Sequence, residues 1–181
     1  MDKWMKPGSL GTESSKVAAK LAISVTIVSG APLSERTILK VNDAAQHIPS
    51  QWRRGIAYAD DVKVGGSLAW RANNPGNLRD ATTKIGTVAG AVGKFAVFGS
   101  LEDGRAAQRS LYLSRYGSMT VKDAINKLTP PSENDTDGYL AKLKKAGVDP
   151  EKDVKSQIDV LMPAVEANEG LIAGTVVKRV P

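Results

Sequence analysis

The sequence predicts a mainly α-helical fold of the α+β class, because three features occur together in a chain of 181 residues. Apolar residues recur at helical spacing in several segments after residue 32, whereas residues 75–99 place Gly, Asn and Pro between short apolar stretches. The chain has 41% hydrophobic residues and no long low-complexity tract, which is typical of a folded core. We therefore expect a helical domain with a small β-hairpin or sheet near residues 75–99.

An N-terminal arm or signal-like segment is expected at residues 1–31. Residues 1–15 are rich in Gly, Ser and Lys and can bury little core. The apolar stretch at residues 17–28 follows Lys16, as in a signal peptide, but Lys20 interrupts it. The stretch is also shorter than the ~20 residues of a membrane-spanning helix, so we expect no stable membrane insertion. For this stretch we favour a buried strand or helix of the mature fold over a cleaved signal.

The domain that we assign to residues 32–181 opens with a helix. Ser34 is a suitable N-cap, apolar residues recur after it at helical spacing, and Pro49 stops the pattern. The single His, His47, lies near the end of this helix and has no second His as a partner, so we assign it a structural role. Farther along the chain, the Lys-Phe-Ala-Val-Phe sequence at residues 94–98 predicts a strand.

Four more helices follow that strand. Each start or end is marked by a residue that satisfies free backbone groups at a helix terminus. The markers are Ser100 with Asp103 for residues 101–116, Thr120 with Asp123 for residues 121–128, Gly147 after residues 136–145, and Asp149-Pro150 at the start of the last helix.

The available residue types restrict the chemistry. The chain has no Cys and one His, which excludes structural zinc sites, cysteine nucleophiles and disulfides. Carboxylates, hydroxyls, amides and amines remain, so we expect no metal and no cofactor. The formal net charge of +6 suits an anionic polymer or surface: nucleic acid, an acidic membrane face or the bacterial cell wall.

The last helix places one carboxylate on an apolar face. Five residues form an apolar stripe at spacings of three and four: Val154, Ile158, Leu161, Met162 and Val165. Glu169 continues this stripe one turn later, so its side chain should face the interior. Burial and the dipole of the helix C-terminus both favour a protonated carboxyl, as a general acid requires. The alternative is a solvated Glu at a frayed helix end.

A second group of polar residues surrounds a Pro-Gly turn between Arg71 and Arg79. Asn73, Asn74 and Asn77 supply amide donors and acceptors, and Asn tolerates left-handed backbone, so the segment can form a rigid loop that presents amides. Such a loop suits the hydroxyls and N-acetyl groups of a sugar. The alternative is a plain turn in which each Asn caps nearby backbone.

Three motifs, in order, resemble a family of phage-associated and bacterial lysozyme-like proteins. They are Trp-Arg-Ala-Asn-Asn-Pro-Gly-Asn-Leu-Arg at residues 70–79, Gly-Lys-Phe-Ala-Val-Phe at residues 93–98 with Glu-Asp-Gly soon after, and Pro-Pro-Ser-Glu-Asn-Asp-Thr at residues 130–136. The resemblance covers residues 65–172 and implies a lysozyme-like fold. Where that family ends in His-Glu-Asn-Gly, this chain has Asn168-Glu169-Gly170, and Ala72 replaces a third Asn.

The same region is similar to bacterial N-acetylglucosaminidases of the flagellar type, through its Asn pair and the Ser-Leu-Glu-Asp sequence at residues 100–103. Those enzymes carry the catalytic Glu shortly before the Asn pair, where this chain has only Asp60 and Asp61. The two resemblances therefore place the acid differently. We favour Glu169, because an Asp would need a closer backbone and because the helix phase directs Glu169 inward.

The resemblances imply cleavage of β-1,4 glycosidic bonds in bacterial peptidoglycan. Glu169 would be the general acid, and Asp60 and Asp61 are the alternative catalytic carboxylates. Glucosaminidase, muramidase and lytic transglycosylase activities are not distinguished. The expected substrate-binding residues are Arg71, Asn73, Asn74, Asn77, Glu133 and Tyr139.

The implied partner is the glycan strand of peptidoglycan, and the implied location is outside the producing cell or in the periplasm of a bacterium. An interbacterial toxin would also have an immunity protein that plugs the groove, whereas a phage-type lysin would not need one. The alternative is a non-catalytic virion or wall-binding protein, favoured by the departures at Ala72 and Asn168. We expect no nucleic-acid binding, because aromatic residues make up only 5% of the chain and no recognition motif is present.

Overall fold

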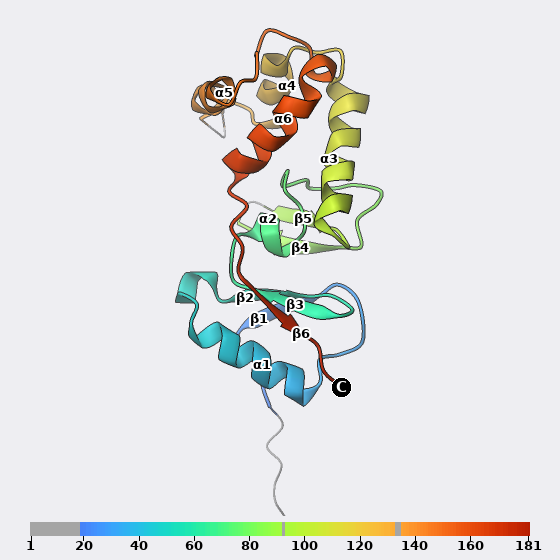
Figure 1. Cartoon of the computed structure of the whole chain (residues 1–181), viewed down its shortest axis with the longest axis vertical. Coiled ribbons are helices and arrows are strands. Elements are labelled where there is room, and N and C mark those ends of the chain that lie inside the picture. Colours follow the sequence, from blue (N-terminus) through green and yellow to red (C-terminus); the bar gives the residue numbers. More distant parts are fainter. Residues whose placement is uncertain (1–18, 92, 133–134) are drawn as a thin grey trace, which may run out of the picture.

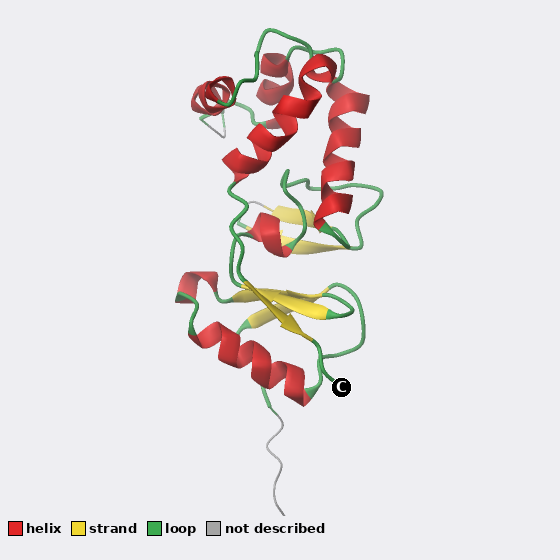
Figure 2. Cartoon of the chain, viewed as in Figure 1, coloured by secondary structure: helices red, strands yellow, loops and turns green. Residues whose placement is uncertain are grey.

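The computed structural model of the chain describes residues 19–91, 93–132 and 135–181, and these form two lobes stacked along the long axis (Figure 1). One lobe is a mixed sheet covered by a helix, and the other contains a β-hairpin and the remaining α-helices (Figure 2). The α+β class predicted from the sequence is therefore confirmed. None of the helices in the described ranges has both the length and the apolar character needed to cross a membrane.

The sheet lobe joins segments from far apart in the sequence. Strand β1 runs parallel to β2, and the other two neighbouring pairs are antiparallel. Helix α1 (Glu35–Gln46) packs on one face of the sheet, and a short 3₁₀ turn (Ser50–Trp52) leads into β2. The strand order across the sheet is β1 (Ser24–Ile27), β2 (Arg54–Ala57), β3 (Asp61–Val64) and β6 (Thr175–Lys178).

The predicted first helix is confirmed as α1. The Ser34 hydroxyl caps it by accepting a hydrogen bond from the Thr37 backbone N at 3.2 Å. The sheet itself is not predicted by the sequence, because its strands are only four residues long and carry few apolar positions each. Strand β1 lies inside the stretch at residues 17–28, where we expected either a signal-like segment or a strand or helix of the mature fold, so Ser24–Ile27 is part of the folded sheet.

The helical lobe contains the predicted hairpin, in which β4 (Gly86–Gly90) pairs with β5 (Gly93–Val97). Its helices α3, α4 and α5 lie in the predicted ranges. The Ser100 hydroxyl and the Asp103 carboxylate each accept a hydrogen bond from the other's backbone N, which forms the expected capping box on α3. The helices are α2 (Leu68–Arg71), α3 (Leu101–Tyr116), α4 (Val121–Leu128), α5 (Thr136–Lys145) and α6 (Val154–Glu169).

The predicted start of α6 is wrong. The helix begins at Val154, where the Asp153 carboxylate accepts a hydrogen bond from the Ser156 backbone N at 2.9 Å. Residues 150–152 lie outside the helix, because the Pro150 and Lys152 carbonyls accept hydrogen bonds from the backbone N of Lys122 and Val121 at the start of α4. Asp149 and Pro150 therefore form a turn beside α4.

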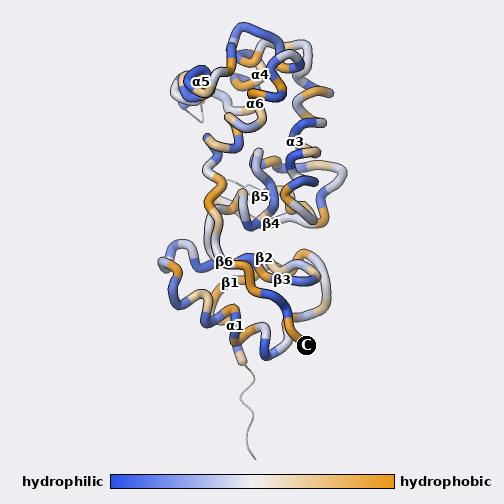
Figure 3. Tube along the Cα trace, in the orientation of Figure 1, coloured by the Kyte–Doolittle hydropathy of each residue, from blue (hydrophilic) through white to orange (hydrophobic). Residues whose placement is uncertain are grey.

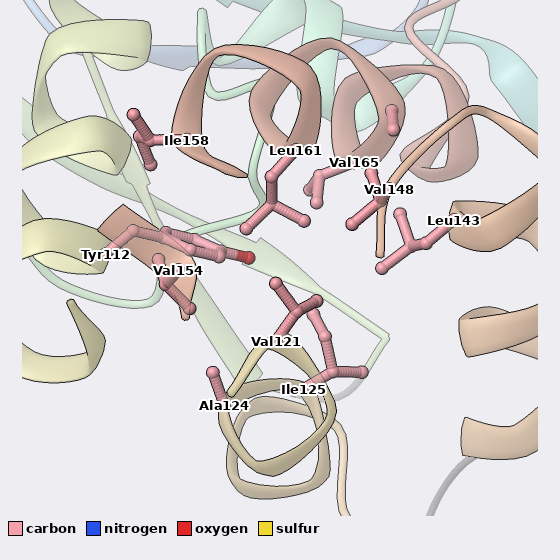
Figure 4. Close-up of a cluster of buried hydrophobic side chains, with 11 residues drawn as sticks. Tyr112, Val121, Ala124, Ile125, Leu143, Val148, Val154, Ile158, Leu161 and Val165 are labelled. Atoms are coloured by element: carbon pink, nitrogen blue, oxygen red, sulfur yellow. The ribbon is translucent and has the colours of Figure 1, made fainter. Parts of the chain in front are cut away.

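The apolar stripe of α6 forms the core of the helical lobe. Ile158, Leu161 and Val165 point from α6 toward the other helices and are at most 5% exposed (Figure 4). They pack with Val121 and Ile125 of α4 and with residues after α5. This packing fixes the rotation of α6, and it therefore sets the direction in which Glu169 points.

Two chain segments connect the lobes, and they cross closely. The Ser67 backbone N donates to the Ile172 carbonyl at 2.9 Å, and the Ile172 N donates to the Ser67 hydroxyl at 3.1 Å. The segment from α6 to β6 is largely hydrophobic (Figure 3). A smaller core closes the junction: Ile56 and Tyr58 of the sheet lobe pack with Ala72 and Val97 of the helical lobe.

Gly66 at this crossing should be intolerant of a side chain. It has a φ of +65°, and a Cβ there would lie 2.5 Å from the Ile172 carbonyl oxygen. We expect Gly66→Ala to lower the free energy of unfolding by at least about 3 kcal/mol, measured by urea denaturation. Gly170→Ala is the matched control, because Gly170 has a φ of +70° with no atom within 4 Å, and it should cost only about 1–2 kcal/mol. Equal losses in the two variants would contradict the close crossing.

Candidate active site

Glu169 is the last residue of α6, and its carboxylate has two side-chain partners. Oε2 accepts a hydrogen bond from Asn77 Nδ2 at 2.6 Å, and Oε1 accepts one from the Tyr139 hydroxyl at 3.3 Å. Gly170 follows with φ 70° and ψ 66°, a left-handed cap that turns the chain away from the helix axis. The half-buried Glu169 side chain is thereby held in one orientation at the end of a packed helix.

Asn77 reaches Glu169 because the Asn-rich loop has a special backbone conformation. Asn73 and Asn77 have positive φ angles of 53° and 49°, in the left-handed region that Asn tolerates. The Asn77 backbone N donates to the Asn74 carbonyl at 3.1 Å, which closes the turn. The side chain of Asn77 is then free to point away from the loop and toward α6.

Two buried tyrosines lie beside the carboxylate. Burial raises the pKa of Tyr139, and the neighbouring Tyr112 and Glu169 charges raise it further, while a hydrogen bond from the Asn168 side chain opposes them. Burial and the Glu169 charge also raise the pKa of Tyr112. Both hydroxyls therefore stay neutral around pH 7. Tyr139 can donate a hydrogen bond to Glu169 but cannot act as a phenolate nucleophile there.

Glu169, Asn77 and Tyr139 line a cleft of about 1290 Å³. Its walls come from the loop at residues 76–83, from α3, and from the ends of α4, α5 and α6. Most of the polar groups that line it are neutral amides and hydroxyls. A cleft of this size and lining can hold a short length of an uncharged polar polymer.

Other carboxylates on the cleft wall are already engaged. Asp80 pairs with Lys84, Asp103 belongs to the capping box of α3, and Asp135 accepts a hydrogen bond from the Gly138 backbone N at 3.0 Å. Among the residues described, Glu169 is the lining carboxylate whose partners are side chains from elsewhere in the fold. No group of three or more His, Asp or Glu side chains suited to a metal ion occurs in the described ranges.

The structure gives Asn73 and Asn74 a different place from the one expected. Both are buried, at 4% and 1% exposed. The Asn74 amide donates to the carbonyls of Leu78 and Ala96, and its oxygen accepts from the Leu78 backbone N, all within 2.9 Å. The Asn73 amide donates to the Phe98 carbonyl at 2.9 Å. These groups are used within the fold, so the expected substrate contact by Asn73 and Asn74 does not fit and their role is to shape the loop.

Arg71 is also turned away from the cleft. It is 7% exposed and donates to the Gly65 and Gly66 carbonyls at 2.9 and 2.5 Å, where the two lobes join. Burial lowers the pKa of Arg71, and the nearby Arg54 charge lowers it further. Lys63 makes a similar link from β3, donating to the Asn73 side-chain oxygen at 2.5 Å. Arg71 therefore does not make the expected contact with substrate in the cleft. It joins the two lobes instead.

Asp60 and Asp61 are not brought to Glu169. Asp60 lies in the turn between β2 and β3 of the sheet lobe, Asp61 begins β3, and neither residue lines the cleft. Asp61 forms an ion pair with Lys178 of β6 at 3.1 Å, and the Asp60 carbonyl accepts a hydrogen bond from the Arg179 backbone N. The alternative acids are thus part of the sheet lobe, which leaves Glu169. The expected contact residue Glu133 lies outside the described residues.

Tyr112 and Asn168 are members of the site that the sequence analysis does not identify as such. Tyr112 lies on the buried face of α3, eight residues after Gly104. Nothing in the sequence around Tyr112 links it to Glu169, which lies 57 residues later. Asn168 stands beside Glu169 and reaches Tyr139. The signal that could have found Tyr112 is the spacing of Gly104, Gln108 and Tyr112 on one helix face.

Comparison with known proteins adds no family assignment. The chain matches no protein-family model, and no curated protein matches it closely enough to indicate homology. The resemblance to lysozyme-like proteins drawn from the motifs stays a prediction.

The buried tyrosines predict how the stability of the protein depends on pH in alkali. Burial raises the pKa of Tyr58, Tyr112 and Tyr139 above the ordinary value of 10.0, so above pH 10 these tyrosines ionise in the unfolded chain while remaining protonated in the folded one. Unfolding then releases protons, and its free energy should fall as pH rises above 10, by up to about 1.4 kcal/mol per pH unit for each tyrosine.

Urea denaturation between pH 9 and pH 11.5 measures this slope. Tyr139→Phe should give a shallower slope, because it removes one of the groups that ionise on unfolding. An identical slope in the variant would show that the Tyr139 hydroxyl is not buried as described.

Proposed function

We propose that this protein cleaves β-1,4 glycosidic bonds in bacterial peptidoglycan, with Glu169 as the general acid. The observation that carries the proposal is the Glu169 carboxylate held by Asn77 and Tyr139 on the wall of a cleft of about 1290 Å³. Glycoside cleavage requires a carboxyl that protonates the leaving oxygen at a fixed position. A cleft whose polar lining is mostly neutral amides and hydroxyls suits a polymer of N-acetylated sugars.

The reaction begins with transfer of the Glu169 proton to the glycosidic oxygen as the C1–O bond breaks. Water or a muramyl hydroxyl then adds at C1, either directly or by displacing an N-acetyl oxygen that has first bonded to C1, and gives its proton to the carboxylate, which restores the acid. The described cleft offers Glu169 no second carboxylate free of other partners, and the buried Tyr112 and Tyr139 are neutral. The nucleophile is therefore water, the N-acetyl group of the substrate or a muramyl hydroxyl. The choice of nucleophile decides whether the protein is a hydrolase or a transglycosylase.

The setting that we propose follows from the substrate. Peptidoglycan lies outside the cytoplasmic membrane, so the protein acts after secretion or delivery into the periplasm, as an interbacterial toxin or a phage-type lysin. The formal charge of +6 favours adsorption to an acidic wall. An immunity protein of a toxin would block activity by filling the cleft that contains Glu169.

A non-catalytic wall-binding role is the second candidate, and one observation favours it. Asn168 stands where the similar lysozyme-like proteins have a His, and it donates to Tyr139 in place of an ionisable group. Ala72, the other departure, is fully buried where the sheet lobe packs, so it does not bear on the cleft. Zymography on a gel containing peptidoglycan separates the two roles, because a binding protein leaves no cleared band.

Replacement of the acid should abolish turnover and leave the fold intact. We expect Glu169→Gln to reduce release of soluble muropeptides from purified sacculi by at least about 100-fold, because the amide cannot donate a proton to the leaving oxygen. Mass spectrometry of the wild-type digest also identifies the new ends as reducing GlcNAc, reducing MurNAc or anhydro-MurNAc.

Glu166→Gln is the matched control. Glu166 lies one turn earlier on α6 and pairs with Arg105 at 2.6 Å, outside the cleft. This variant should retain wild-type turnover. If Glu169→Gln is as active as Glu166→Gln, Glu169 is not the acid.

The Asn-rich loop should separate into a functional and a structural part. Asn77→Gly keeps a left-handed backbone but removes the amide that orients Glu169, so we expect turnover to fall about tenfold or more with little change in stability. Asn74→Ala removes the side chain that bonds the Leu78 backbone N and the Ala96 carbonyl, so the free energy of unfolding should fall by about 2–3 kcal/mol.

Thermal denaturation and muropeptide release measured on both variants check this contrast. A large loss of stability in Asn77→Gly, or none in Asn74→Ala, would contradict the assignment of the two roles.

A further inference from the structure

The buried face of α3 meets the Asn-rich loop at two successive turns and Glu169 at a third. Gly104, Gln108 and Tyr112 are spaced by four residues and are the buried residues of this helix. Gly104 lies directly against the Asn73 carbonyl, since any Cβ there would overlap that oxygen. Tyr112 interacts with the Glu169 charge. Gln108 lies between these two contacts, beneath the middle of the loop.

Gln108 touches the residue that precedes Asn77. A Cβ on Gly76 would lie 2.5 Å from the Gln108 carboxamide carbon and 2.6 Å from its nitrogen, so the glycine backbone rests on the amide. The carboxamide also interacts electrostatically with the Tyr112 hydroxyl, although the two form no hydrogen bond of ordinary length. Gln108 thus contacts Gly76 and interacts with Tyr112, and both of these residues line the cleft that contains Glu169.

The Gln108 side chain is an unusual choice for this position. It is 1% exposed, and neither its nitrogen nor its oxygen has a hydrogen-bond partner among the described residues. A buried amide without partners destabilises a protein, and Met or Leu would fill nearly the same volume without that cost. Gln108 does not line the cleft, so direct contact with substrate does not account for it.

We infer that Gln108 is a positioning residue for the active site, which sets the Asn77–Glu169 hydrogen bond from behind the loop. This inference rests on the proposed function for its catalytic consequence, but its structural part does not. The planar carboxamide supports the Gly76 backbone and so fixes the height of Asn77 above α3. Its dipole also acts on the Tyr112 hydroxyl, which faces Glu169 from the opposite side.

The first experiment measures the Asn77–Glu169 hydrogen bond in the protein without substrate. In Gln108→Met, the NMR resonance of the Asn77 side-chain amide should move toward its position in Glu169→Ala, where the acceptor is absent. Leu113→Gln is the matched control, because Leu113 lies on the exposed side of the same helix, 37% exposed and outside the cleft lining. This control should leave the Asn77 resonance unchanged. Gln108→Leu provides a second apolar variant if Gln108→Met does not fold.

The second experiment measures stability and turnover in the same variants. Removal of the unpaired amide should raise the Tm of Gln108→Met by about 2–4 °C. The kcat for muropeptide release should fall about tenfold, while KM stays within about twofold, because the acid and not the substrate is displaced. A residue with a merely structural role would not combine a higher Tm with a lower kcat.

The outcomes separate the two proposals. If the wild-type protein releases no muropeptides, the glycosidase proposal fails, and the Asn77 resonance alone still decides the role of Gln108. An unchanged Asn77 resonance in a folded Gln108→Met protein overturns the inference. Wild-type kcat in that variant, with an active wild type, also overturns it.

Discussion

The buried amides of Asn73 and Asn74 are the constraint on which the site depends. They hydrogen-bond to backbone groups of the hairpin and of the loop itself, including the carbonyls of Ala96 and Phe98. Short loops rich in Pro and Gly have few apolar contacts to fix them, so internal side-chain hydrogen bonds must do it. With the loop fixed in this way, Asn77 is the one Asn of the motif whose amide reaches α6.

Glu169, the proposed acid, and Asn77 lie 92 residues apart in the sequence, and the sheet lobe helps to keep them together. After Gly170 the chain crosses Ser67 and returns as β6, which pairs with β3. Arg71 and Lys63 tie the same junction to the base of the Asn-rich loop. Both partners of the Asn77–Glu169 pair are therefore anchored close to one place, where the two lobes meet.

Local signals predicted the parts of the fold that local chemistry determines. The caps at Ser34, Ser100 and Thr120 mark helices whose free N–H groups need a side-chain acceptor, and the stripe on α6 predicts the inward face. The sheet was not predicted because its strands are short and pair with strands far away in the sequence. No single segment therefore shows a clear alternation of apolar and polar residues. The start of α6 was missed because hydrogen bonds to α4, which are non-local, exclude residues 150–152 from the helix.

The location of the candidate site could be predicted from the sequence, but the separate roles of its residues could not. Helix phase is enough to direct Glu169 inward, yet three Asn residues in one turn look equivalent until burial distinguishes Asn77 from the other two. Asp60 and Asp61 remained alternatives to Glu169 as the catalytic carboxylate, because the sequence alone does not show which lobe contains them. Tyr112 could be assigned to the site only from the packing of α3 against the Asn-rich loop. That packing depends on Gly104 and Gly76 having no side chains.

The position of β6 in the sequence has a consequence for how the protein assembles during synthesis. Lys178 pairs with Asp61 across 117 residues, so this contact forms only after nearly all of the unit has left the ribosome. A nascent chain that contains α3, α4 and α5 but not β6 can pair only three of the four strands of the sheet. The contact between Glu169 and Asn77 can form only after α6 has been made, which is later than the synthesis of the whole Asn-rich loop.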